Sequence, residues 1–222
     1  MTVSQTTCIW DTSFLDPGAE SRNPLALIVL NQPFTLATFT ELWVKCQWKI
    51  FADGGSNRVY DAFGSEERLR YLPHYIKGDM DSIRPEVRSW YAEQGVRVES
   101  VEDQDSTDLM KCIAWVDQVE RNQKVKGHHQ IELNLQFVGP TCGLLPVGIA
   151  SSVLTTTGLK WNLDAAESSF DGLVSTSNSI LPVSNAESAG RVTIETTEPI
   201  WWCVENKRAG QGTNVRGEDS GP

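Results

Sequence analysis

Residues 25–33 read Leu-Ala-Leu-Ile-Val-Leu-Asn-Gln-Pro, an unbroken apolar run that ends in a turn signal. Such runs are typical of strands buried on both faces of a parallel sheet. A short apolar strand followed by Gly, Asn or Asp recurs at 48–55 and at 72–82. Since parallel strands need crossover connections, the stretches between them are expected to be helices. These three segments therefore predict an α/β fold with a parallel sheet.

The rest of the first half continues this alternation. Helices are expected at 34–47, 57–63, 85–94 and 109–121, and a further strand at 96–101. Strands that alternate with helices indicate βαβ units. We therefore expect an N-terminal Rossmann-like parallel-sheet domain over residues 25–127, after an N-terminal extension at residues 1–24.

The second half of the chain changes character, because helical periodicity disappears from residue 128 onward. Alternating or β-branched runs, separated by Gly, Asn and Pro, occur at 131–138, 153–157, 173–176 and 192–196. This pattern predicts a C-terminal antiparallel β-sandwich domain over residues 128–206. Residues 207–222 are polar and Gly-rich, and we expect them to form a disordered tail.

The net charge of the chain limits the kinds of molecule that it is expected to bind. The chain has a formal net charge of −10, which argues against a nucleic-acid-binding face and against an anionic membrane surface. An anionic substrate such as ATP remains compatible if metal ions offset the local negative charge. The five cysteines are scattered without CxxC spacing, and residues 1–16 lack signal-peptide character, so a cytoplasmic protein is expected.

Acidic residues follow the predicted strands. In the segment 78–82, Gly-Asp-Met-Asp-Ser, Asp79 and Asp81 are separated by one residue and point the same way on an extended chain. Two such carboxylates repel each other unless a cation lies between them, and oxygen ligands suit Mg²⁺. The alternative is a solvated loop that leads into a helix.

Two further motifs are expected at the same edge of the sheet. The segment 103–108, Asp-Gln-Asp-Ser-Thr-Asp, carries three acids that are either metal ligands or favourable charges at a helix N-terminus. The segment 52–58, Ala-Asp-Gly-Gly-Ser-Asn-Arg, offers glycines that cradle a phosphate or simply form a turn, together with the cation Arg58. Ligands of open α/β sheets bind at the carboxyl ends of the strands, where these motifs fall.

These motifs resemble, in order and spacing, those of the eukaryotic thiamine pyrophosphokinases. The resemblance in the first half rests on residues 31–33, 52–58, 78–83 and 103–108. In the second half, it rests on residues 142–148, 155–162 and 173–178. It implies an α/β nucleotide domain followed by a β-sandwich, and a homodimer whose sites combine the α/β domain of one subunit with the β domain of the other.

The resemblance also implies residue roles. Catalytic acids that handle Mg²⁺ are implied at Asp79, Asp81 and Asp108. Thiamine-binding residues are implied at Gln104, Trp161, Ser175, Ser177 and Asn178, although Trp161 and Ser175 also fit a sandwich core and a β ladder. ATP-binding residues are expected at Asn31, Asp53, Gly54, Gly55, Asn57, Arg58, Asp105 and Thr107.

The resemblance implies a reaction in which ATP gives its pyrophosphoryl group to thiamine, with AMP as the second product. One segment of the family pattern is absent, because residues 118–127 lead directly into the predicted β domain without a Gly-Gly-x-x-Gly-Arg-x-Asp motif. We therefore expect an incomplete α/β domain with weak or absent kinase activity. The alternatives are a catalytically impaired splice-type variant that acts in binding or dimerisation, and a Mg²⁺-dependent nucleotide hydrolase.

Overall fold

A computed structural model describes residues 7–21, 24–103, 106–119, 126–182 and 189–207. The chain forms two compact units. We call them the α/β unit, which contains the described residues from 21 to 119, and the β unit, which contains those before 21 and after 125. None of the helices in the described ranges combines the length and apolar character that a membrane crossing requires.

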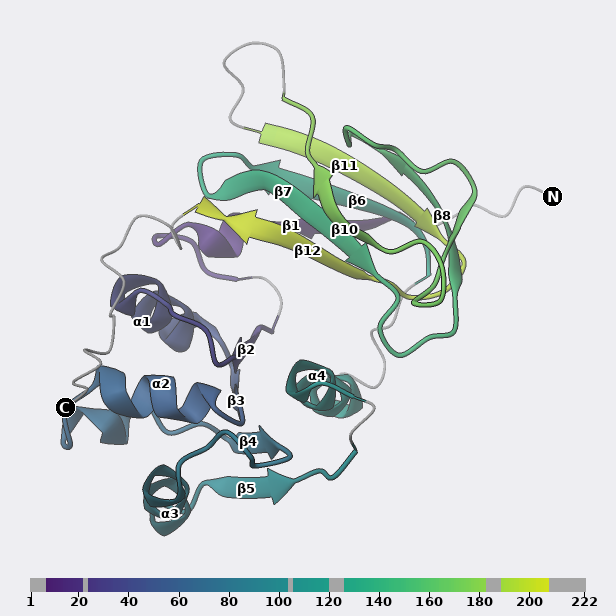
Figure 1. The fold of residues 1–222 in the computed structure, drawn as a ribbon. Coiled ribbons are helices and arrows are strands. Elements are labelled where there is room, and N and C mark those ends of the chain that lie inside the picture. The colour runs from purple at the N-terminus through teal and green to yellow at the C-terminus, as the bar shows by residue number, and fades with distance from the viewer. Residues whose placement is uncertain (1–6, 22–23, 104–105, 120–125, 183–188, 208–222) are drawn as a thin grey trace, which may run out of the picture. The chain divides into compact units, whose positions relative to one another are not determined.

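The α/β unit contains a four-stranded parallel sheet in the order β2-β3-β4-β5 (Figure 1). Its strands are β2 (Ala26–Val29), β3 (Trp48–Ala52), β4 (Tyr75–Gly78) and β5 (Arg97–Ser100). Its helices are α1 (Leu36–Lys45), α2 (Gly55–Ala62), α3 (Pro85–Glu93) and α4 (Asp108–Val119), with a 3-10 helix at Glu67–Arg70. The predicted parallel α/β fold is confirmed.

Alternate strand residues form a core on each face of this sheet. Phe51 of β3 packs with Phe39 of α1 and with the buried residues of α2 and α3. Its neighbour Ile50 packs on the opposite face against Cys112 and Val116 of α4. Because successive strand side chains point to opposite faces, α1, α2 and α3 cover one face and α4 covers the other.

Helix boundaries follow the local sequence. The Oγ1 atom of Thr35 accepts a hydrogen bond of 3.2 Å from the backbone N–H of Thr38 and so caps α1. Pro85 stands in the first turn of α3, where its missing N–H costs nothing. Gly95 follows α3 with a φ of +80°, a conformation that favours glycine.

The β unit is a sandwich of two sheets, with strand orders β1-β6-β11-β8-β9 and β10-β7-β12. The strands of the larger sheet are β1 (Cys8–Asp11), β6 (Gly127–Asn134), β11 (Ala189–Thr196), β8 (Ser152–Thr157) and β9 (Ala166–Ser168). Those of the smaller sheet are β10 (Ser175–Ser179), β7 (Val138–Leu145) and β12 (Trp201–Asn206). Leu133, Leu144 and Leu154 lie in one buried core formed by both sheets, so the predicted antiparallel β domain is confirmed.

The β unit also contains strands that the sequence analysis did not predict. The segment treated there as an N-terminal extension supplies β1, which pairs in parallel with β6, and a 3-10 helix at Ser13–Leu15. Leu15 is buried in the sandwich core. Of the predicted tail, residues 208–222 lie outside the described residues.

Candidate functional site

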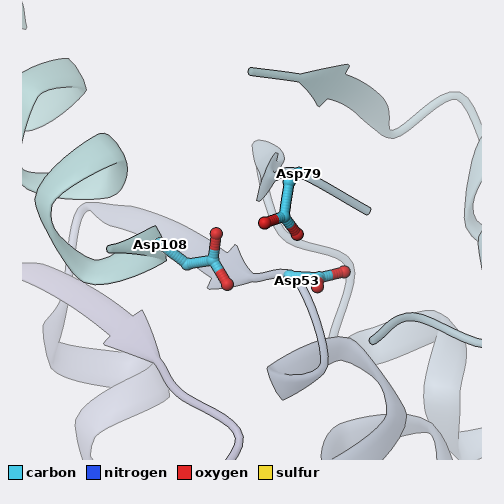
Figure 2. A group of neighbouring side chains, drawn as sticks. All are labelled: Asp53, Asp79 and Asp108. Atoms are coloured by element: carbon cyan, nitrogen blue, oxygen red, sulfur yellow. The ribbon is translucent and has the colours of Figure 1, made fainter. Parts of the chain in front are cut away.

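Three carboxylates from separate segments converge in the α/β unit. Asp53 follows β3, Asp79 follows β4, and Asp108 begins α4. Each offers an oxygen atom, and these oxygens lie within 4.8 Å of one another. Figure 2 shows the three side chains close together, with the carboxylates of Asp79 and Asp108 turned toward each other and that of Asp53 beside them. The geometry suits a metal ion, because hard cations are held by several carboxylate oxygens.

Gly78, the last residue of β4, makes room for this convergence. A Cβ atom at this position would lie 2.6 Å from the Asp53 Cβ and 2.9 Å from the Asp108 Oδ1. Real side chains do not tolerate such distances, so any larger residue would push the two acids apart. The glycine of the 78–82 motif is therefore a steric requirement of the cluster.

Asp53 links the end of β3 to the loop that follows β4. Its carboxylate accepts hydrogen bonds from the backbone N–H groups of Ser82, at 2.9 Å, and Ile83, at 3.0 Å. Asp53 is fully buried and has a φ of +39°, which is uncommon for a residue with a side chain. Its side chain thus fixes the loop that carries Asp79 and Asp81.

Burial raises the pKa of the Asp53 carboxyl above its ordinary value, because a buried charge loses its hydration. The N–H donors of Ser82 and Ile83 oppose this rise, and the negative charge of Asp108 adds to it. A cation bound between the acids would relieve that repulsion. The electrostatics and the geometry therefore indicate the same kind of ligand.

Asp81 is exposed and lies beside the three-carboxylate group rather than in it. The Ser82 hydroxyl donates a hydrogen bond of 2.8 Å to its Oδ1 and is the main reason that its pKa is lowered. Met80, between the two motif acids, has a φ of +69°. Backbone strain of this kind in a non-glycine residue is typical of functional loops.

The glycine pair after β3 lets α2 begin against the end of β2. A Cβ atom on Gly55 would lie 2.2 Å from the Val29 carbonyl oxygen, and one on Gly54 would lie 2.7 Å from the Asn31 Nδ2. Arg58 donates a hydrogen bond of 2.9 Å from Nε to the Asn31 Oδ1, and both side chains are exposed. The structure thus brings Gly54, Gly55 and Arg58 of the 52–58 motif together with Asn31, which follows β2.

The remaining predicted residues of this unit anchor the local backbone or lie outside the described residues. The Asn57 side chain donates to the Ser82 carbonyl at 2.8 Å and accepts from the Arg84 N–H at 3.1 Å. Thr107 Oγ1 accepts a hydrogen bond of 3.3 Å from the Met110 N–H at the start of α4. The predicted residues Gln104 and Asp105 lie outside the described residues.

One residue beside the cluster was missed by the sequence analysis. Lys111 lies one turn after Asp108 on α4, and its Nζ is 3.4 Å from the Asp108 Oδ1 and 3.9 Å from the Asp79 Oδ2. The only signal in the sequence is the spacing of three between Asp108 and Lys111, which places both on the same side of a helix.

In the β unit, Asn178 holds the loop that presents Trp161. The backbone N–H of Trp161 donates to the Asn178 Oδ1 at 3.2 Å, and Asn178 Nδ2 donates to the Trp161 carbonyl at 2.8 Å. Asn178 is buried, whereas 55% of Trp161 is exposed. Ser175 Oγ lies 3.4 Å from Asn178 Nδ2, and Ser177 is exposed on β10. Trp161 therefore lies at the surface and not in the sandwich core.

Two family models match the chain. Residues 39–139 match the thiamin pyrophosphokinase catalytic domain, and residues 128–201 match the thiamin pyrophosphokinase vitamin B1 binding domain. Thiamine pyrophosphokinase 1 of Arabidopsis thaliana is 33% identical over 261 residues, with 91% of this chain and 94% of that protein covered. Thiamine pyrophosphokinase 3 of Oryza sativa subsp. japonica is 34% identical, with 81% and 86% covered.

Solved structures agree on the fold. The thiamin pyrophosphokinase from Candida albicans superimposes with a TM-score of 0.59 at 21% identity, with 93% of this chain and 95% of that chain covered. An α/β unit with a carboxylate cluster at the carboxyl ends of its strands, followed in the chain by a β-sandwich, defines a two-unit protein with a candidate metal site. The chain belongs to the thiamine pyrophosphokinase family.

Replacing Asp53 with alanine should destabilise the α/β unit. The N–H groups of Ser82 and Ile83 would lose their acceptor, and an unsatisfied buried donor costs about 1–3 kcal/mol. We expect urea unfolding followed by circular dichroism to show a loss of that size. Glu67→Ala is the control, because Glu67 is an exposed acidic residue on the 3-10 helix Glu67–Arg70 and its loss should leave the unfolding midpoint unchanged. An Asp53→Ala variant as stable as the wild type would contradict the linking role.

Proposed function

We propose that this chain is a thiamine diphosphokinase, which transfers the pyrophosphoryl group of ATP to the hydroxyl group of thiamine. The observation that carries the proposal is the carboxylate cluster of Asp53, Asp79 and Asp108, whose oxygens lie within 4.8 Å of one another in a chain of this family. Such a cluster concentrates negative charge where an anionic substrate must bind, so a divalent cation is part of the proposal.

Mg²⁺ is the proposed cation, with Asp79 and Asp108 as its principal ligands and Asp53 as the third. Carboxylate oxygens suit this ion, which usually keeps substrate phosphates and water among its other ligands. Bound there, Mg²⁺ would offset the negative charge that spreads over the phosphate oxygens during transfer. Asp81, whose carboxylate is exposed beside the cluster, is proposed as a further ligand on the solvent side.

The reaction balances as a displacement at the β-phosphorus of ATP. The thiamine hydroxyl oxygen forms a bond to that phosphorus, and the bond from the β-phosphorus to the oxygen bridging to the α-phosphorus breaks. AMP leaves with the bridging oxygen, and a carboxylate of the cluster accepts the hydroxyl proton. Transfer of this kind depends mainly on positioning and on charge neutralisation.

The exposed groups around the cluster are proposed to hold ATP. The Arg58 guanidinium provides a cation for phosphate oxygens, and its hydrogen bond to Asn31 fixes its direction. Gly54 and Gly55 let the start of α2 approach the end of β2 closely, and helix N-termini favour anions. Further ATP contacts are proposed for Asp105 and Thr107, while Asn57 acts through the loop it anchors.

Thiamine is proposed to bind against Trp161, which is 55% exposed. The Lys160 Nζ lies over this indole ring, 4.5 Å from its centroid, and the cationic thiazolium ring would contact the other face. Asn178 acts by holding the Trp161 backbone, and Ser175 and Ser177 lie on the same strand, β10. Gln104 is proposed as a further thiamine contact. The proposal also includes a homodimer, and a cytoplasmic location that fits the five free cysteines.

A second candidate function is binding without efficient turnover. The alignment with the Arabidopsis relative runs over 261 residues although this chain has 222, so that relative contains residues without a counterpart here. In addition, α1, α2 and α3 cover one face of the sheet, whereas α4 covers the other. A right-handed crossover through a helix on that second face leads to a parallel strand beside β2, at the edge of the sheet. In this chain, the strand that follows α4 is instead β6 of the β unit. Both observations favour the absence of an internal segment of the α/β domain.

An assay of AMP formation separates these functions. The purified chain with ATP and Mg²⁺ should release AMP only when thiamine is present, and Asp79→Ala should lower the rate by at least about 100-fold because cation-assisted charge neutralisation is lost. Glu67→Ala, at an acidic residue exposed on the 3-10 helix, is the control and should keep the wild-type rate.

The other outcomes of that assay are equally informative. AMP release without thiamine would support the nucleotide hydrolase instead. Thiamine and a non-hydrolysable ATP analogue that raise the melting temperature while no AMP forms would support the binding function. Unchanged activity of Asp79→Ala would contradict the proposed metal site.

Thiamine binding provides a separate test in the β unit. Trp161→Ala should weaken thiamine binding about fivefold or more, because a cation–π contact worth about 1 kcal/mol is lost, and leave the unfolding midpoint unchanged. Asn178→Ala should weaken binding and also lower the free energy of unfolding, by about 1–3 kcal/mol. Phe170→Ala is the matched control, because 55% of Phe170 is also exposed in this unit. Calorimetry with thiamine measures the affinities, and an equal effect at Phe170 would argue against a specific contact.

A further inference from the structure

Lys111 is a buried cation in contact with two acids of the cluster. Only 4% of its side chain is exposed, whereas lysines are almost never buried without a partner. Its Nζ lies 3.4 Å from the Asp108 Oδ1 and 3.9 Å from the Asp79 Oδ2. These carboxylates come from different segments, the start of α4 and the loop after β4, so one ammonium group bridges two parts of the site.

Taking the proposed metal site as given, we propose that Lys111 is a positioning residue whose ammonium group is the resident counter-ion of the cluster. It holds Asp79 and Asp108 together in the metal-free protein. Lys111 stands in the first turn of α4, where its backbone N–H donates to the Thr107 carbonyl at 3.0 Å, so a change of its side chain leaves that helix bond in place.

The balance of charge supports this role. Asp53, Asp79 and Asp108, with the exposed Asp81 beside them, carry four formal negative charges, and Lys111 contributes one positive charge. The three negative charges that remain still favour the binding of a divalent cation. Buried ionic groups are tolerated when they are paired in this way, and removal of one partner leaves the other uncompensated.

Lys111 and a divalent cation would share the same two carboxylates. Their positive charges repel each other at such short range, so each weakens the binding of the other. A neutral residue at position 111 should therefore destabilise the metal-free protein but strengthen the binding of metal. A lysine that serves only the packing of α4 would lower stability equally with and without metal.

Titration with Mn²⁺ alone tests this inference without thiamine or ATP. Free Mn²⁺ is measured by electron paramagnetic resonance on the full chain, wild type and variants. Lys111→Gln should bind Mn²⁺ about tenfold more tightly than the wild type, a change that corresponds to about 1.4 kcal/mol. Mn²⁺ should also raise its melting temperature more. Lys111→Arg keeps the positive charge and should bind Mn²⁺ as the wild type does.

Lys45→Gln is the matched control. Lys45 also pairs with a carboxylate, Glu41, at 3.5 Å, and only 12% of its side chain is exposed. It ends α1 just before β3 begins, whereas the cluster follows the other end of that strand. Its substitution should leave Mn²⁺ affinity unchanged.

The outcomes separate this inference from the proposed function. Wild-type binding of Mn²⁺ with equal or weaker binding by Lys111→Gln would overturn the counter-ion role alone. No binding of Mn²⁺ by the wild type would overturn the metal site and the counter-ion role with it. Should Lys111→Gln be unfolded without metal, Mn²⁺ should restore its circular dichroism, because the metal replaces the missing charge; failure to do so would overturn the role.

Discussion

Mutual repulsion among Asp53, Asp79 and Asp108 is the constraint on which the rest of the site depends. Three carboxylates with oxygens within 4.8 Å of one another are unfavourable unless positive charge offsets them. The scaffold opposes this repulsion with specific bonds: N–H groups of the loop after β4 bind Asp53, and Lys111 contacts the other two acids. Such an arrangement keeps the cluster ready for a divalent cation and an anionic substrate.

The fold explains why these acids meet. Parallel strands bring their carboxyl ends to one edge of the sheet, where the loops after β3 and β4 lie side by side. Gly78 leaves the space for Asp53 and Asp108, and Gly55 lets α2 begin against β2. The β unit carries the second set of polar and aromatic residues, in which hydrogen bonds of the buried Asn178 fix the position of the exposed Trp161.

Much of this arrangement could be predicted from the sequence, because buried parallel strands have continuous apolar runs and turn residues follow them. The apolar run at 25–30 predicted the sheet, and the acidic motifs predicted the edge at which the carboxylates meet. Asp53 was predicted only as a contact for ATP, since nothing local reveals that its carboxylate reaches Asp79. Lys111 and β1 were missed for the same physical reason: a buried ion pair and a strand pairing with β6 depend on contacts between residues distant in the chain.

Anomalous X-ray scattering from crystals of the full chain grown with Mn²⁺ tests the central claim most directly. We expect a single strong anomalous peak within coordination distance of carboxylate oxygens of Asp53, Asp79 and Asp108. Absence of a peak at saturating Mn²⁺, a peak elsewhere only, or three carboxylates turned away from one another would contradict the account.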